Sequence, residues 1–136
     1  MAKLFKFEVV TPNRIFHSDE VELIVFETEV GQMGVMADHV PMLVANKMCT
    51  LKIQKNKETK YAFISEGFME ISSTKVSAVV DDAEWCDEID IEDAINVKKK
   101  AEEELMNKKG DLSMKAELKA SIERSAARIK TGRMIK

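Results

Sequence analysis

The stretch LFKFEVV, residues 4–10, alternates large apolar residues with charged ones. Phe5, Phe7 and Val9 share one side of an extended chain, and the lysine and glutamate between them share the other. Successive side chains of a β-strand point to opposite faces, so this alternation predicts a strand with one buried face. The residues TPN that follow, at 11–13, are typical of a turn.

The same period of two continues to about Asp82. Further segments with this character are separated by turn signals such as KNKE and by glycines, at intervals of roughly 8 to 12 residues. They are VELIVFETEV (21–30), TLKIQ (50–54), KYAFIS (60–65), FMEI (68–71) and KVSAVV (75–80). This spacing predicts a small antiparallel β-sandwich.

After Asp82 the chain changes to residues that favour helices, with apolar positions at helical spacing. One predicted helix carries Ile91, Ile95, Ala101 and Leu105, and a second carries Met114, Leu118, Ile122, Ala126 and Ile129. Asp90 is a predicted N-cap, and Asp93 lies where a carboxylate favours the helix dipole. Lysines followed by Gly110 end the first helix, and Asp111 caps the second.

So short a connection predicts either an antiparallel hairpin or one bent rod. We expect two units, a sandwich over residues 1–86 and a helical unit over residues 87–136. Each helix offers mainly alanines and isolated Ile or Leu side chains, worth about 1.5 to 3 kcal/mol each when buried. Because so few apolar side chains would hold the helices in place, we expect helices that can leave one protein surface and bind another. The alternative is a permanently packed hairpin.

The net charge of −3 over 136 residues hides an asymmetry. Residues 1–111 carry 14 basic and 22 acidic side chains, whereas residues 112–136 carry 7 basic and 2 acidic ones. A basic tail on an acidic body predicts attraction to nucleic acid, anionic lipid or an acidic protein surface. Without a long apolar run, we expect a protein that is neither exported nor membrane-spanning.

The chain shows little that predicts catalysis. Gly31 and Gly34 fit neither a Walker A loop nor a dinucleotide fingerprint, so we expect them to form tight turns. His39 has no predicted nucleophile or carboxylate partner, since the adjacent Asp38 would point to the opposite face. Cys49 and Cys86 are predicted to be reduced packing residues, and no metal site is predicted. Three methionines around His39 favour a contact surface: Met33, Met36 and Met42.

Taken together, several segments resemble the epsilon subunit of bacterial rotary ATP synthases. They are VVTPNRIFHSDEVE (9–22), GxxGVxxDHVP (31–41), ISEGFMEI (64–71), KVSAVVDDAE (75–84) and IDIEDA (89–94). They occur in the family's order at near-constant spacing across almost the whole chain. The resemblance implies a sandwich of about ten strands followed by a helical hairpin, in a subunit that catalyses nothing.

In that family the subunit lies at the foot of the central stalk, bound to the gamma subunit and to the membrane ring of c subunits. The resemblance implies ring contacts at Glu29, Gly31 and Gln32, and gamma contacts at His39 and Met42. It also implies a peripheral position on the cytoplasmic face of the cell inner membrane. The tail would restrain ATP hydrolysis by reaching the catalytic alpha and beta subunits through Lys115, Lys119, Arg124, Arg128 and Lys130.

Some members of the family bind ATP through a motif resembling [IL]DxxRA. Here Ile89, Asp90 and Ala94 match, but Asp93 occupies the arginine position, and a carboxylate repels phosphate. The remaining candidates for this site are Glu84, Arg124 and Arg128. We therefore expect weak or absent ATP binding and no cofactor. A nucleotide-sensing module remains one alternative, and a nucleic-acid adaptor another, although the tail after Trp85 has no aromatic residue for base stacking.

Overall fold

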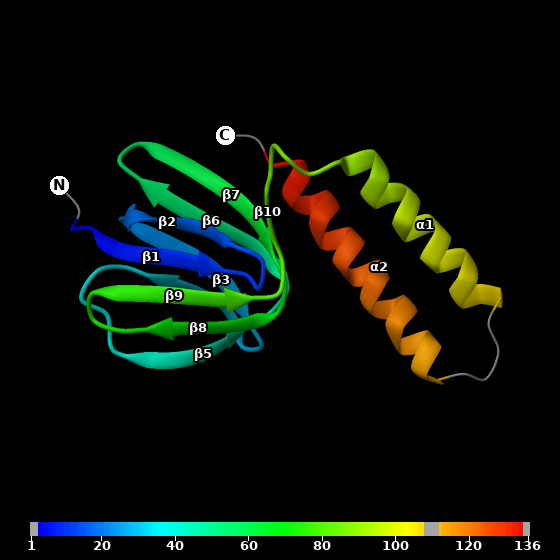
Figure 1. Cartoon of the computed structure of the whole chain (residues 1–136), viewed down its shortest axis with the longest axis horizontal. Coiled ribbons are helices and arrows are strands. Elements are labelled where there is room, and N and C mark those ends of the chain that lie inside the picture. Colours follow the sequence, from blue (N-terminus) through cyan, green and yellow to red (C-terminus); the bar gives the residue numbers. More distant parts are fainter. Residues whose placement is uncertain (1–2, 108–111, 135–136) are drawn as a thin grey trace.

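A computed structural model describes residues 3–107 and 112–134 of the chain, which form a β-structure followed by two helices (Figure 1). The strands and helices of the described part are β1 (Phe5–Val10), β2 (Ile15–Val21), β3 (Leu23–Thr28), β4 (Gly31–Val35), β5 (Met42–Asn46), β6 (Cys49–Lys55), β7 (Glu58–Ile64), β8 (Gly67–Ile71), β9 (Lys75–Val80), β10 (Ala83–Trp85), α1 (Ile91–Asn107) and α2 (Leu112–Gly132). The ten strands and two helices confirm the predicted fold class.

The strands form two five-stranded sheets packed face to face. One sheet has the order β2-β1-β9-β8-β5, and the other has the order β10-β7-β6-β3-β4. One pairing departs from the antiparallel prediction, because β1 and β9 run parallel, with Phe7 opposite Val76. Alternation along a strand predicts which side chains are buried but not the direction of the neighbouring strand, so this pairing was not foreseeable.

The core lies between the sheets and is built from the inward-facing residues of nearly every strand. Phe5, Phe7 and Val9 are all buried, as the opening stretch predicts. Phe26 is fully buried in this core from the opposite sheet, whereas Phe63 on β7 is buried outside it, under Arg124 of α2. Interlocked aromatic and β-branched side chains at interior packing density make this part of the molecule stiff.

A two-residue turn joins β6 to β7. Lys55 pairs with Glu58, which leaves Asn56 and Lys57 in the turn, and Asn56 has a φ of 57°. Asparagine adopts this left-handed conformation more readily than most residues, which fits a tight hairpin turn. The turn predicted from KNKE is confirmed.

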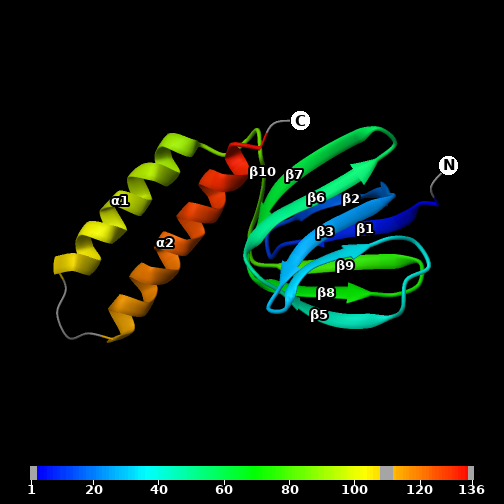
Figure 2. The ribbon, with the colours of Figure 1, turned by 180° about the vertical axis from the view of Figure 1, so that it is seen from behind.

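The helices lie side by side as an antiparallel hairpin at one end of the sandwich, so the hairpin and not the bent rod is found (Figures 1 and 2). Asp90 caps α1, since its carboxylate accepts a hydrogen bond from the Asp93 backbone N–H at 3.0 Å. The break predicted at Gly110 and Asp111 lies outside the described residues. No helix within the described ranges is long and apolar enough to cross a membrane.

The two helices contribute few buried apolar side chains of their own. In α1 the buried residues are Ala94 and Ala101, and in α2 they are Ser125 and Thr131. Ala126, predicted to lie on the apolar face of α2, is exposed. The helix is rotated so that small polar residues meet its neighbours, and apolar periodicity alone does not reveal this orientation.

Candidate functional site

The turn between β3 and β4 presents Glu29 and Val30 to solvent on a well-ordered base. The buried hydroxyl of Thr28 donates a hydrogen bond to the Gly31 carbonyl at 2.9 Å and accepts one from the Val30 N–H at 3.3 Å. Gly31 has a φ of +124°, a conformation that other residues rarely adopt. Val30 is 98% exposed at the tip, so this turn can meet a neighbouring surface.

The second glycine of this segment is not a turn residue. Gly34 lies inside β4 opposite Val25, and space remains around it for a Cβ atom at ordinary contact distances. The prediction of a tight turn there is wrong, because only Gly31 requires an unusual φ. Glycine in a strand interior marks a place of low side-chain bulk, and here Gly34 is exposed.

His39 lies in the connection between β4 and β5, against the start of β1. Its ring meets the Phe5 ring edge-on, with the centroids 5.6 Å apart. Both ring nitrogens are buried and have no hydrogen-bond partner among residues 3–107 and 112–134. The neighbouring Asp38 turns away, at a φ of 63°, and pairs with Lys3 at 2.8 Å. His39 and Asp38 therefore do not form a catalytic pair.

The two groups of predicted contact residues lie at opposite ends of the sandwich. Glu29 shares a hollow with Lys47 and Gly67, at the beginning of β8. Asp38, next to His39, lies near the other end of β8. Its backbone N–H donates a hydrogen bond to the carbonyl of Ser73, which follows that strand. Met42 is half exposed at the beginning of β5, near the His39 end. A single small partner surface would not cover both groups.

An exposed apolar strip crosses the outer face of β5, β8 and β9. Leu43, Phe68 and Val79 are 69%, 55% and 53% exposed. Phe68 lies opposite Val79 in the sheet and beside a hollow of about 390 Å³ that Val10 and Val79 also line. The signal for this surface was the unbroken apolar run in MLVAN and the paired valines of KVSAVV, which indicate strands covered on both faces.

The candidate ATP residues do come together, but they pair with one another. Arg128 on α2 donates two hydrogen bonds to the carboxylate of Glu84, at 2.7 and 3.1 Å. Its Nη1 atom also lies 3.8 Å from an oxygen of Asp93. One turn earlier on the helix, Arg124 forms an ion pair with Asp82. Ile89 and Ala94 are buried.

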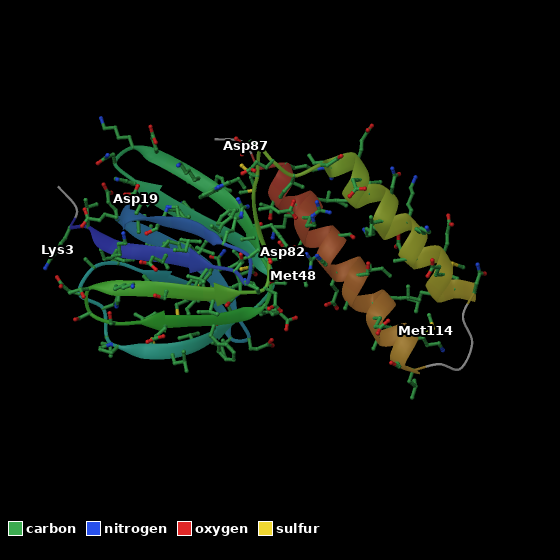
Figure 3. The ribbon with its side chains drawn as sticks, in the orientation of Figure 1. Lys3, Asp19, Met48, Asp82, Asp87 and Met114 are labelled. Atoms are coloured by element: carbon green, nitrogen blue, oxygen red, sulfur yellow. The ribbon has the colours of Figure 1, made fainter. Side chains whose placement is uncertain are left out.

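The basic residues of α2 do not form one cluster. Arg124 and Arg128 face the sandwich, while Lys119 and Lys130 are exposed and Lys115 is half buried. Figure 3 places Asp82 at the end of the sandwich that faces α2, and Met114, next to Lys115, at the far end of that helix. The predicted regulatory arm is therefore divided between a docked half and a solvent-facing half.

The thiols and acidic groups show no catalytic arrangement. Cys49 and Cys86 are both buried and unbonded, as predicted. Burial raises the pKa of the Cys49 thiol to about 11, so this thiol stays protonated and unreactive near neutral pH. Within the described residues, no group of three or more His, Cys, Asp or Glu side chains is placed to hold a metal ion.

The sequence of this chain is similar to those of known proteins. A family model for the β-sandwich domain of ATP synthase delta/epsilon chains matches residues 4–86. The ATP synthase epsilon chain of Caldanaerobacter subterraneus subsp. tengcongensis is 40% identical over 131 residues, covering 96% of this chain and 94% of the relative. That of Alkaliphilus oremlandii is 36% identical over 111 residues, covering 82% and 83%.

A solved structure has the same fold. A chain of the Euglena gracilis mitochondrial ATP synthase, in a structure of OSCP, F1 and the c-ring, superposes with a TM-score of 0.80. The superposition covers 91% of this chain and 78% of that chain, at 18% identity. The likeness at this identity concerns the fold, which includes the region of the two helices.

Proposed function

The chain belongs to the ATP synthase epsilon-chain family and is a component of that complex, and from this premise we propose that it is a non-catalytic subunit of the rotating central stalk. In this role it helps to couple ion flow through the membrane ring to ATP synthesis. The observation that carries the proposal is the 40% identity to an epsilon chain along both the sandwich and the hairpin. A stiff sandwich suits a part that transmits torque.

The exposed apolar strip supports docking on the gamma subunit. Leu43 and Phe68 give the outer face of the sheet a hydrophobic surface of the kind that marks a protein interface. Met42 lies next to Leu43 of the strip on β5. His39 packs on Phe5 and so holds the connection between β4 and β5 against the sandwich. We assign gamma contact to this face, with Met42 in the interface and His39 at its margin.

The β3–β4 turn is the proposed contact with the ring of c subunits. Glu29, Gly31 and Gln32 are all exposed. The Thr28 hydrogen bonds hold the turn in one shape, which favours a contact that must bear load. Through this contact the subunit would lie at the cytoplasmic face of the cell inner membrane.

Co-purification with the gamma subunit tests the docking face. Phe68→Glu places a charge in the centre of the apolar strip, so we expect gamma recovery to fall at least tenfold when the two chains are co-expressed. Val97→Lys is the matched control, because Val97 is an exposed apolar residue on α1, away from the strip. Equal gamma recovery with Phe68→Glu and the unmodified chain would contradict the assignment.

The hairpin is the proposed regulator of ATP hydrolysis. Lys115, Lys119 and Lys130 lie on the tail that carries the excess of positive charge, and Arg124 and Arg128 join them when α2 leaves the sandwich. We propose that an undocked α2 meets acidic surfaces of the catalytic alpha and beta subunits. The division into units at residues 1–86 and 87–136 is part of this proposal, with the link between β10 and α1 as the hinge.

An ATP-sensing module is the competing function, and the ion pairs oppose it. A nucleotide phosphate at Arg128 would have to displace Glu84 and approach Asp93, which has the same sign of charge. We therefore propose that ATP binds weakly or not at all. Calorimetry with ATP on the isolated chain tests this, alongside Asp93→Arg, which removes the opposing carboxylate. Micromolar binding by the unmodified chain would contradict the proposal.

A further inference from the structure

The end of α2 reaches the sandwich through polar contacts as well as apolar ones. Thr131 is fully buried, and its hydroxyl oxygen lies 2.6 Å from that of Thr50 at the start of β6. Gly132 packs so closely that a Cβ atom there would lie 2.8 Å from the Ile91 side chain. The hydroxyl pair fixes where α2 meets β6, and the Gly132 contact fixes the end of α2 against the beginning of α1.

The Arg128–Glu84 ion pair is less exposed than the Arg124–Asp82 pair at this junction. Its side chain is 16% exposed and that of Glu84 is 25% exposed, so solvent screens the pair only in part. The two parallel hydrogen bonds form the fork geometry in which a guanidinium binds a carboxylate most strongly. Glu84 belongs to β10 and Asp93 to α1, so Arg128 joins three elements at once.

A second pair extends the charged contact along α2. Arg124 forms an ion pair with Asp82, which lies just before β10. Arg124 also stacks over the Phe63 ring, with its guanidinium carbon 5.8 Å from the ring centroid. Two guanidinium groups thus face three carboxylates, all supplied by the chain itself. These five groups together carry one negative charge, and no external anion is required to neutralise the arginines.

We propose that these five residues form a charge latch, defined as Arg124, Arg128, Asp82, Glu84 and Asp93, which closes the hairpin on the sandwich without a bound ligand. The latch supplies the specificity that the sparse apolar contact lacks, because a bidentate pair fixes both position and orientation. It also makes closure sensitive to salt, since its pairs are partly solvated.

The latch sets up a competition that rests on the proposed regulatory role of α2. Arg124 and Arg128 cannot bind Asp82 and Glu84 while also binding acidic groups of another subunit. Opening the latch therefore releases the cations that an acidic partner would take, and closing it withdraws them. The docked and undocked forms are alternative uses of the same two side chains.

Hydrogen–deuterium exchange of α2 amides in the isolated full-length chain tests the latch. Short isolated helices are marginal in water, so undocking of α2 appears as faster amide exchange. We expect Arg128→Gln and Glu84→Gln each to accelerate α2 exchange by about tenfold. The double variant should exchange at about the rate of the singles, because the interaction is lost once. Asp93→Asn should accelerate exchange by about threefold.

Further measurements distinguish undocking of α2 from unfolding of the sandwich. Amides of β1, β6 and β9 should keep their protection in every variant, which shows that the sandwich remains folded. Lys119→Gln, an exposed lysine on the same helix, should leave α2 exchange unchanged. Raising NaCl to about 1 M should accelerate α2 exchange in the unmodified chain, and by a smaller factor in the double variant, which keeps only the Arg124–Asp82 pair of the latch.

The latch is refuted if Arg128→Gln leaves α2 exchange unchanged, or if the two single effects multiply in the double variant. It is equally refuted if α2 becomes protected in the unmodified chain only when ATP or inorganic phosphate is added. None of these measurements involves another subunit. Failure of the latch is therefore separate from failure of the stalk role, which gamma co-purification tests.

Discussion

The sandwich and the hairpin interface are held together by different kinds of interaction. Inside the sandwich, Phe7 and Phe26 are fully buried against apolar neighbours from both sheets. At the interface, the Phe63 ring is buried under Arg124 of α2, and ion pairs and a hydroxyl pair accompany it. Burial is non-directional and insensitive to salt, whereas ion pairs depend on geometry and ionic strength. One region is therefore suited to stay rigid, and the other is suited to open and close.

The largest expected effect is a loss of unfolding free energy when a core residue of the sandwich is truncated. Phe7→Ala removes a fully buried ring, and we expect the sandwich to lose about 3 to 5 kcal/mol of unfolding free energy. Urea denaturation followed by circular dichroism measures this loss. Lys119→Gln on the exposed face of α2 serves as the control and should shift stability by less than about 0.5 kcal/mol. A Phe7→Ala loss below about 1 kcal/mol would mean that the sandwich is not a tightly packed body.

A smaller and more local effect is expected at the hydroxyl pair. Thr131→Val keeps the shape but leaves the Thr50 hydroxyl without its partner, so α2 docking should weaken by about 1 to 3 kcal/mol. Amide exchange of α2 measures this, while the global urea midpoint should hardly move. The double variant Thr50→Val/Thr131→Val should recover much of the loss, since no unpaired hydroxyl remains. A double variant worse than Thr131→Val would show that the hydroxyls are not a pair.

The smallest effect concerns the pH dependence of the sandwich. Burial lowers the pKa of His17 below its usual value, against the opposing effect of the hydrogen bond to the Phe7 carbonyl. The unfolded chain then binds a proton that the folded chain rejects, so stability is full above about pH 6.5 and falls as the pH drops toward the folded pKa. His17→Gln should flatten this part of the stability curve, measured by urea unfolding between pH 7.5 and roughly pH 5. An unchanged slope would assign the pH dependence to other groups.

Much of the fold was predictable because local chemistry determines it. Alternation in LFKFEVV placed Phe5, Phe7 and Val9 inside the core, and Asp90 caps α1 as expected from its side chain and position. The sequence pattern could not reveal the parallel pairing of β1 with β9, since both directions bury the same face. Apolar periodicity likewise placed Ala126 on the buried face of α2, where Ser125 lies instead, because small polar residues of this helix face its neighbours.

The candidate site was predictable as a set of residues but not as an arrangement. Glu84, Arg124 and Arg128 were selected from the sequence as candidate nucleotide contacts, Asp93 was named as the carboxylate that opposes such a site, and Asp82 was not selected. Their mutual ion pairs depend on how α2 docks on β10, which joins residues about 40 positions apart and leaves no local pattern. The exposed strip around Phe68 was missed because strand alternation directs attention to the buried face. Long apolar runs in β5 and β9 carried that information.

The sandwich is proposed to dock on the gamma subunit, and the hairpin is proposed to regulate ATP hydrolysis. One truncation tests both roles. ATP synthase complexes should be purified with the full chain and with a chain that lacks residues 112–136, and their gamma content and ATP hydrolysis rates compared. We expect that gamma is retained in equal amount and that hydrolysis rises when α2 is absent. Unchanged hydrolysis, or loss of gamma from the truncated complex, would contradict this division.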